Sequence, residues 1–293
     1  MPDSRVVYLL AALAVCGVVY LAAWFKLGRP QSDDDKGPPT PTHVGLGFVI
    51  NFFDTLGIGS FAPTTAMYRL LKLVPDERIP GTLNVGHTIP TVLQALFFIS
   101  VVEVEFRTLV ILIVASVLGA GLGAVVVAGW PRRKIQLGMG IALLVAALLF
   151  TLTNLGIVAG GGDAVGLVGG KLALAVAGNF ALGALMTLGI GLYGPSLIMI
   201  ATLGMNPKVA FPIMMGSCAF LMIVAGIRFL RAGAYRQKPA LGLTIGGIPA
   251  VLIAVLIVKS LPLTAVRWLV AVVVLYTGVT MLRAALRPAP NPR

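Results

Sequence analysis

Charged residues are scarce in this chain of 293 residues. Asp, Glu, Lys and Arg together make up 11% of it, against about 25% in a typical soluble domain. Apolar residues make up 58% before the 35 glycines are counted. Because this composition supplies too little polar surface for a water-soluble globule, we expect an all-α polytopic membrane protein.

Cysteine and histidine are also few, with two of each. Cys16 and Cys218 both lie inside apolar stretches, which excludes a disulfide framework and any Cys/His zinc spacing. The sequence contains no Gly-x-x-x-x-Gly-Lys nucleotide loop, so an ATP-driven pump is disfavoured. We expect no cofactor and no resident metal.

Basic residues outnumber acidic ones by 22 to 10, which gives a net charge of +12. They lie between apolar runs rather than on one face. This distribution fits the positive-inside bias of membrane proteins better than a nucleic-acid binder, so no nucleic-acid partner is expected.

The first apolar run, residues 6–25, is long enough to cross a hydrocarbon core of about 30 Å. Trp24, Phe25 and Lys26 stand where a signal peptide would have a small-residue cleavage site, so a retained helix is predicted. The polar linker that follows, residues 27–42, has no apolar periodicity and is predicted to be exposed and mobile.

Ten apolar segments follow in two series of five, joined by a glycine-rich link. The two series match in order and approximate length, the first being 43–59, 63–73, 81–102, 108–130 and 135–158, and the second 172–191, 195–204, 209–229, 240–258 and 265–282.

A short stretch of amino-acid sequence is also repeated. Thr-Leu-Gly-Ile-Gly at residues 55–59 recurs at 187–191, and Pro63 and Pro195 follow at the same spacing. We infer an internal duplication. The predicted units are an N-terminal helix with its linker (1–42), a first repeat (43–158), a link (159–171) and a second repeat with a short tail (172–293).

The second segment of each repeat is too short to span a membrane, since 11 residues of helix cover about 16 Å. We therefore predict that the first two segments of each repeat form a broken or re-entrant hairpin. Three full spans then remain per repeat, and an odd number of spans makes the second repeat inverted relative to the first.

Charge favours the same topology. With the linker in the cytoplasm, sixteen of the 22 basic residues lie inside and six outside, and the C-terminus is cytoplasmic. The six outside are Arg5, Arg107, Lys171, Lys208, Lys259 and Arg267.

Each predicted hairpin passes through Gly-Ile-Gly and then Pro. Proline is favoured in the first turn of a helix, and a helix N-terminus offers free N–H groups and partial positive charge to an anion. Two such N-termini near the midplane are typical of secondary transporters. The candidate substrate-binding residues are Gly57, Gly59, Ser60, Thr64, Thr65, Gly189, Gly191, Tyr193 and Ser196. Their hydroxyls could instead simply cap the half-helices.

Asp54 is the only acid inside a predicted membrane segment, where an ionisable group is costly and by default functional. We assign it to proton or cation coupling, with His87 as a second candidate. The alternative is a structural role, in which Asp54 bonds the broken backbone or pairs with His87. The glycines at 119–123 and 246–247 are predicted to form surfaces for close helix packing.

The two breaks resemble the TauE/SafE family of membrane transporters, often called sulfite exporters. The resemblance rests on Gly-Ile-Gly followed by Pro, which reads LGIGSFAP at 56–63 and LGIGLYGP at 188–195. It extends over about residues 43–286 and leaves out the first helix and the linker. It implies transport of small sulfur-containing anions such as sulfite, sulfonates or sulfoacetate across the cytoplasmic membrane. The family's longer glycine run is replaced here by Ser60-Phe61 and Leu192-Tyr193.

The sequence thus predicts a proton-coupled secondary transporter of a small anion, not an enzyme, with the anion and the lipid bilayer as partners. A homo-oligomer is compatible with it. Two alternatives stay open: a cation or metal permease that uses Asp54, and a membrane subunit without transport activity. One acid and one histidine are few ligands for a metal path.

Overall fold

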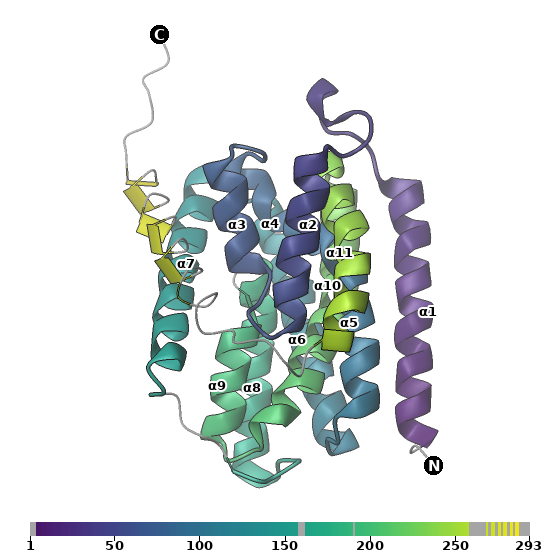
Figure 1. Ribbon diagram of the computed structural model, residues 1–293, viewed down its shortest axis with the longest axis vertical. Coiled ribbons are helices and arrows are strands. Elements are labelled where there is room, and N and C mark those ends of the chain that lie inside the picture. Colours follow the sequence, from purple (N-terminus) through teal and green to yellow (C-terminus); the bar gives the residue numbers. More distant parts are fainter. Residues whose placement is uncertain are drawn as a thin grey trace.

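The computed structural model describes residues 4–157, 162–189, 191–257 and some residues between 268 and 286. The regular structure in this part of the chain is helical, apart from one isolated β-bridge (Figure 1). The helices are α1 (Ser4–Leu27), α2 (Pro41–Thr55), α3 (Phe61–Leu70), α4 (Ile79–Gly86), α5 (Thr88–Val101), α6 (Phe106–Ala128), α7 (Arg132–Asn154), α8 (Gly169–Met186), α9 (Tyr193–Thr202), α10 (Ala210–Ala232) and α11 (Gln237–Ile257).

Within the described residues, five helices are long and apolar enough to cross a membrane: α1, α6, α8, α10 and α11. A sixth span is formed if α4 and α5 count as one bent unit. The expectation of an all-α polytopic membrane protein is confirmed. The predicted last span, 265–282, lies almost wholly outside the described residues.

The segment 81–102, predicted to be a full span, is divided into two helices. α4 and α5 meet at His87, and the two halves are bent by 41°. Pro90 explains the break, because it has no N–H to donate to the carbonyl of Gly86. That carbonyl instead accepts a hydrogen bond from Thr244 Oγ1 at 2.6 Å.

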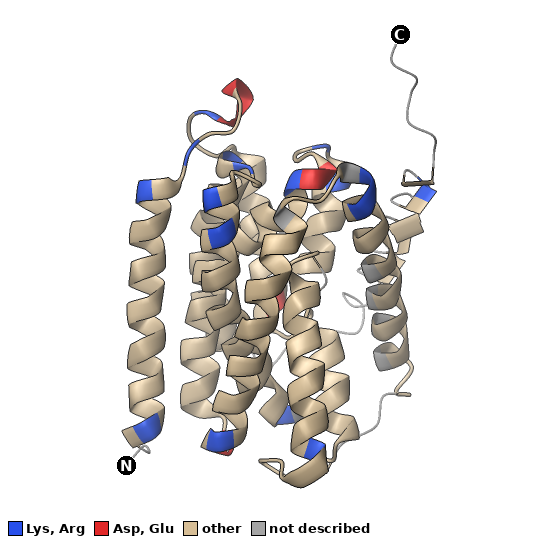
Figure 2. Ribbon diagram, turned by 180° about the vertical axis from the view of Figure 1, so that it is seen from behind, with Lys and Arg blue, Asp and Glu red and all other residues tan. Residues whose placement is uncertain are grey.

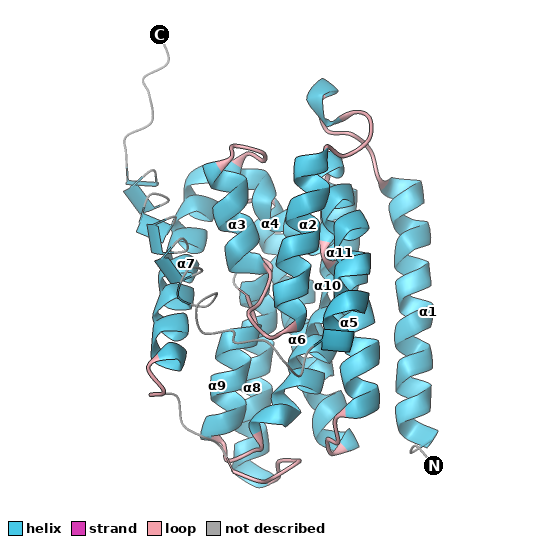
Figure 3. Cartoon of the chain, in the orientation of Figure 1, coloured by secondary structure: helices cyan, strands magenta, loops and turns pink. Residues whose placement is uncertain are grey.

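The two segments too short to span a membrane form α3 and α9. Each is the second arm of a hairpin that turns back inside the bundle. In Figure 1, α2 enters from the upper end and the chain returns to that end as α3. α8 and α9 make the same excursion from the lower end, and the loops between the arms lie near mid-height (Figure 3). α3 and α9 have 10 residues each, and each begins two residues before its proline, at Phe61 and Tyr193.

Glycine is needed directly after α2 and directly after α8, the helices that lead into the two breaks. Gly57 and Gly189 occupy equivalent places in the repeated motif and have φ angles of 90° and 88°. This left-handed conformation is open to glycine at little cost but is strained for other residues. The shared backbone geometry explains why the same letters recur after α2 and after α8.

Two helix crossings are close enough to require glycine. A Cβ atom on Gly246 of α11 would lie 2.0 Å from the carbonyl oxygen of Val44 in α2. A Cβ atom on Gly119 of α6 would lie 2.0 Å from the carbonyl oxygen of Phe180 in α8. The predicted small-residue packing surfaces are confirmed at these positions. Such close backbone contact is what drives helix association in lipid.

The linker after α1 is not wholly exposed, contrary to expectation. The Asp35 side chain is buried and accepts hydrogen bonds from the backbone N–H groups of Gln31, Gln237 and Lys238, at 2.8–3.0 Å. Two of these donors begin α11, whose first N–H groups have no partner within the helix. Asp35 therefore caps α11 and fixes the linker to the second half of the chain.

Replacing this cap should destabilise the protein measurably. We expect Asp35→Ala to lower the free energy of unfolding by about 1–2 kcal/mol, the usual value of a helix cap. Asp33→Ala is the matched control, since the Asp33 side chain is 95% exposed. Thermal unfolding of both variants in detergent measures the difference. Equal stability of the two variants would show that Asp35 does not hold the linker in place.

Figure 2 shows most of the coloured Lys and Arg residues at the end of the bundle that carries the linker, and only a few at the opposite end. The two ends of the bundle thus carry different numbers of basic residues, which is the kind of asymmetry that the positive-inside bias describes.

Candidate functional site

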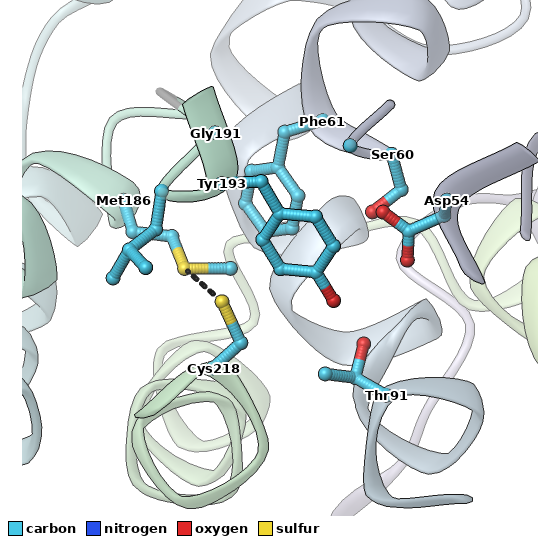
Figure 4. Close-up of a pocket in the computed structure, with 10 residues that line it drawn as sticks. Asp54, Ser60, Phe61, Thr91, Met186, Gly191, Tyr193 and Cys218 are labelled. Carbon is cyan, nitrogen blue, oxygen red and sulfur yellow. Dashed lines mark hydrogen bonds between the residues drawn. The ribbon is translucent and has the colours of Figure 1, made fainter. Parts of the chain in front are cut away.

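A small cavity lies where the two broken hairpins approach each other (Figure 4). It is lined from the first hairpin, the second hairpin, α5 and α10, by Asp54, Gly59, Ser60, Phe61, Thr91, Met186, Gly191, Leu192, Tyr193 and Cys218. Its volume is about 10 Å³, which is room for about one water molecule. In this conformation the site is therefore closed.

A chain of hydrogen bonds joins the two hairpins across this cavity. Asp54, 1% exposed at the end of α2, accepts a bond from Gln94 Nε2 at 2.9 Å. Gln94 Oε1 accepts a bond from the hydroxyl of Tyr193 at 2.9 Å. Tyr193 is the first residue of α9, so the amide of Gln94 connects a carboxylate of the first hairpin to a hydroxyl of the second.

The other carboxylate oxygen of Asp54, Oδ1, is less well hydrogen-bonded than Oδ2. Among the described residues no hydrogen bond of good geometry reaches Oδ1, although Ser60 lies beside it (Figure 4). Among the described residues, the groups recorded against the carboxylate are the Gln94 amide and Ser60, neither of which is a cation. An acid placed in this way inside a membrane is a functional residue by default.

His87 lies at the break between α4 and α5, and it is fully buried. Its Nδ1 lies 2.9 Å from Asn51 Oδ1, and its Nε2 lies 3.0 Å from Thr64 Oγ1. Both ring nitrogens are engaged, so the histidine ties the break to α2 and α3. The pairing of Asp54 with His87 that we considered is not found, because Asp54 pairs with Gln94 instead.

The structure brings together about half of the residues expected at the site. Those that line the cavity are Asp54, Gly59, Ser60, Gly191 and Tyr193. Those that do not are Gly57, Thr64, Thr65, His87, Gly189 and Ser196.

Two of the residues away from the cavity have buried hydroxyls that make no hydrogen bond within the described part of the chain. These residues are Thr65 and Ser196. Thr65 is the fifth residue of the half-helix α3, and Ser196 is the fourth residue of the half-helix α9.

Sequence reasoning missed Gln94, Thr91 and Cys218. Of these, Gln94 could have been found from the sequence, because an amide inside an apolar segment needs a buried hydrogen-bond partner. Cys218 makes a 3.6 Å contact with the Met186 sulfur, which suits a packing residue. In the described part of the chain, no group of three or more His, Cys, Asp or Glu residues could hold a metal ion.

A bundle of apolar helices that is broken around a cavity containing a buried acid is the architecture of a membrane transporter. The sequence model of the family described as Sulfite exporter TauE/SafE matches residues 1–150, just over half of the chain. The chain therefore belongs to the TauE/SafE family.

The match begins at residue 1, so it includes α1 and the linker, which the motif resemblance leaves out, and it ends before the second Gly-Ile-Gly. No curated protein and no solved structure matches the chain. Membership of this family makes the chain a multi-pass membrane transporter of sulfite-like anions and not an enzyme.

Proposed function

We propose that this protein is a secondary transporter that moves a small sulfur-containing anion, of the sulfite, sulfonate or sulfoacetate class, across the cytoplasmic membrane together with protons. The observation that carries the proposal is the meeting of two re-entrant hairpins, entering from opposite ends, at one cavity that contains a buried acid.

The packing of the helices supports an inverted repeat. α2 packs against α11, and its counterpart α8 packs against α6. At the two crossings, Gly246 of α11 faces Val44 and Phe48 of α2, and Gly119 of α6 faces Phe180 and Ala184 of α8. Each hairpin thus packs on a span of the other repeat, as two halves related by a twofold axis would.

On this basis the units are the first helix and linker (1–42), the first repeat (43–158), the link (159–171) and the second repeat (172–293). The crowding of Lys and Arg at the linker end supports a cytoplasmic location for that end (Figure 2). The C-terminus, which we also propose to be cytoplasmic, lies outside the described residues.

The anion binds between the N-termini of α3 and α9. Their first N–H groups have no partner within the helix and carry partial positive charge. The buried hydroxyls of Thr65 and Ser196 lie close to these N-termini and make no hydrogen bond to another described residue, so they can bond a ligand after a small rearrangement. Because the closed cavity holds about one water, the two breaks must separate before an anion of several heavy atoms enters.

Asp54 would repel an anion while it is ionised. A proton on the carboxylate removes this repulsion, so anion and proton bind together and move in the same direction. Among the described residues, the scarcity of metal-binding groups argues against the alternative of a metal permease. The paired breaks would have no purpose in a membrane subunit without transport activity.

The test is uptake into proteoliposomes of labelled sulfite, sulfoacetate and taurine, with and without an imposed pH gradient. We expect protein-dependent flux of at least one of these anions, with accumulation towards the more alkaline side. Protein-free liposomes are the control for leakage. Flux of cations but of none of these anions, in liposomes shown to be tight, would overturn the proposal.

A further inference from the structure

Gln94 makes more polar contacts in the closed site than any residue we predicted there. It is fully buried on α5, and its amide nitrogen donates to Asp54 Oδ2 at 2.9 Å and to Thr55 Oγ1 at 3.0 Å. Its amide oxygen accepts from the Tyr193 hydroxyl at 2.9 Å. Both N–H groups of the amide therefore donate to the first hairpin, and its oxygen accepts from the second.

The neighbours of this amide fix its orientation. The Thr55 hydroxyl donates its one hydrogen to the carbonyl of Asn51 at 2.8 Å, so it faces Gln94 as an acceptor. An ionised Asp54 is also only an acceptor. Two acceptors on one side require the NH₂ group there, which leaves Oε1 towards Tyr193.

Tyr193 closes the cavity. Its ring lies across the space between the breaks, with the hydroxyl turned towards the side of Asp54 and Thr91 (Figure 4). A space for about one water cannot accept an anion with three oxygens while the ring stays in place. The ring must therefore swing away, and its bond to Gln94 must break, each time the site opens.

We propose that Gln94 is a positioning residue that latches Tyr193 across the cavity while Asp54 is ionised and releases it when Asp54 takes up a proton. This proposal deepens the proposed function and rests on it. Bonds to an ionised acceptor are stronger than neutral ones, and hydrogen bonds in series polarise one another. An ionised Asp54 thus makes Gln94 Oε1 a better acceptor for Tyr193, and a neutral Asp54 weakens that bond.

The charge that operates this latch is that of Asp54. The titratable residues lining the cavity are Asp54 from α2, Tyr193 from α9 and Cys218 from α10. Tyrosine and cysteine are neutral at pH 7 unless strongly activated, so Asp54 is the cavity residue whose charge is expected to change during transport.

Cys218 provides a readout that needs no substrate. It is 1% exposed and lines the cavity, and Cys16 is the one other cysteine of the chain. In a Cys16→Ser background, a small methanethiosulfonate reagent measures how often the cavity opens. We expect Gln94→Met and Tyr193→Phe, which break the same bond from either side, to raise the labelling rate about tenfold, as the loss of one buried hydrogen bond predicts.

Gln136→Met is the matched control. Gln136 is also buried and donates to a carboxylate, Asp76 Oδ2, at 2.7 Å, but it lies outside the cavity. It should leave the labelling rate of Cys218 unchanged. An equal rise in the control would mean that labelling reports general loosening of the bundle, and no rise with either latch variant would overturn the latch.

Asp54→Asn tests the charge at constant pH. It should raise labelling about threefold when Gln94 is present and add nothing in the Gln94→Met background. An equal rise in both backgrounds would show that Gln94 does not transmit the charge. Because labelling requires no anion, a protein that passes these tests yet transports none of the anions would refute the proposed function and leave the latch standing.

Discussion

Asp54→Asn should reduce pH-gradient-driven accumulation of the anion at least tenfold while exchange of anion for anion at symmetrical pH stays within about threefold of wild type. Asparagine has nearly the same shape and keeps one oxygen to accept the Gln94 N–H bond, so the fold of the site is retained although the charge is lost. It cannot take up or release a proton. Each tenfold loss corresponds to about 1.4 kcal/mol of coupling between proton and anion.

Asp34→Asn is the control for this experiment. Asp34 lies on the linker with its side chain 78% exposed, and it should leave both rates unchanged. Accumulation that survives in Asp54→Asn would move the coupling role to another residue. Loss of exchange together with accumulation would mean that the carboxylate binds the substrate or holds the fold.

Gly246→Val and Gly119→Val should each prevent correct folding or destabilise the protein by roughly 3 kcal/mol or more. In each crossing the new Cβ would lie 2.0 Å from a carbonyl oxygen of the facing helix, and backbone cannot move aside as a flexible side chain can. If the two crossings are equivalent by an inverted repeat, the two substitutions should cause similar losses in thermal stability.

Gly45→Val and Gly121→Val are the controls, one on α2 and one on α6. An added Cβ meets nothing within 4 Å at Gly45, and its nearest neighbour at Gly121 is 3.9 Å away. Both controls should fold normally. A large loss at one crossing and none at the other would contradict the equivalence of the two repeats.

The breaks in the hairpins could be predicted from sequence because their causes are local. Gly57 and Gly189 provide the left-handed turns, and Pro63 and Pro195 sit in the first turns of the half-helices. The same kind of signal at Pro90 was overlooked, since a lone proline in a long apolar segment looks tolerable until the missing hydrogen bond to Gly86 is considered.

The hydrogen bonds of the site could not be predicted, because they join residues far apart in the chain. Gln94 bonds to Tyr193 across 99 positions, and Asp35 caps a helix about 200 residues away. Composition and periodicity carry no information about which distant helix faces which. The sequence identified Asp54 as an isolated acid, but only the packing of α2, α5 and α9 reveals its partner.

The central claim is that a small anion binds between the two breaks, and equilibrium binding of labelled sulfite to the purified protein tests it most directly. Ser60→Leu fills the cavity from the first hairpin and Gly191→Leu fills it from the second, and both residues line the cavity. Gly45→Leu, on an open face of α2, is the control. The account predicts that each filling variant loses binding while the control keeps it. Binding that survives in both filling variants, or that only one hairpin affects, would contradict a site shared by the two halves.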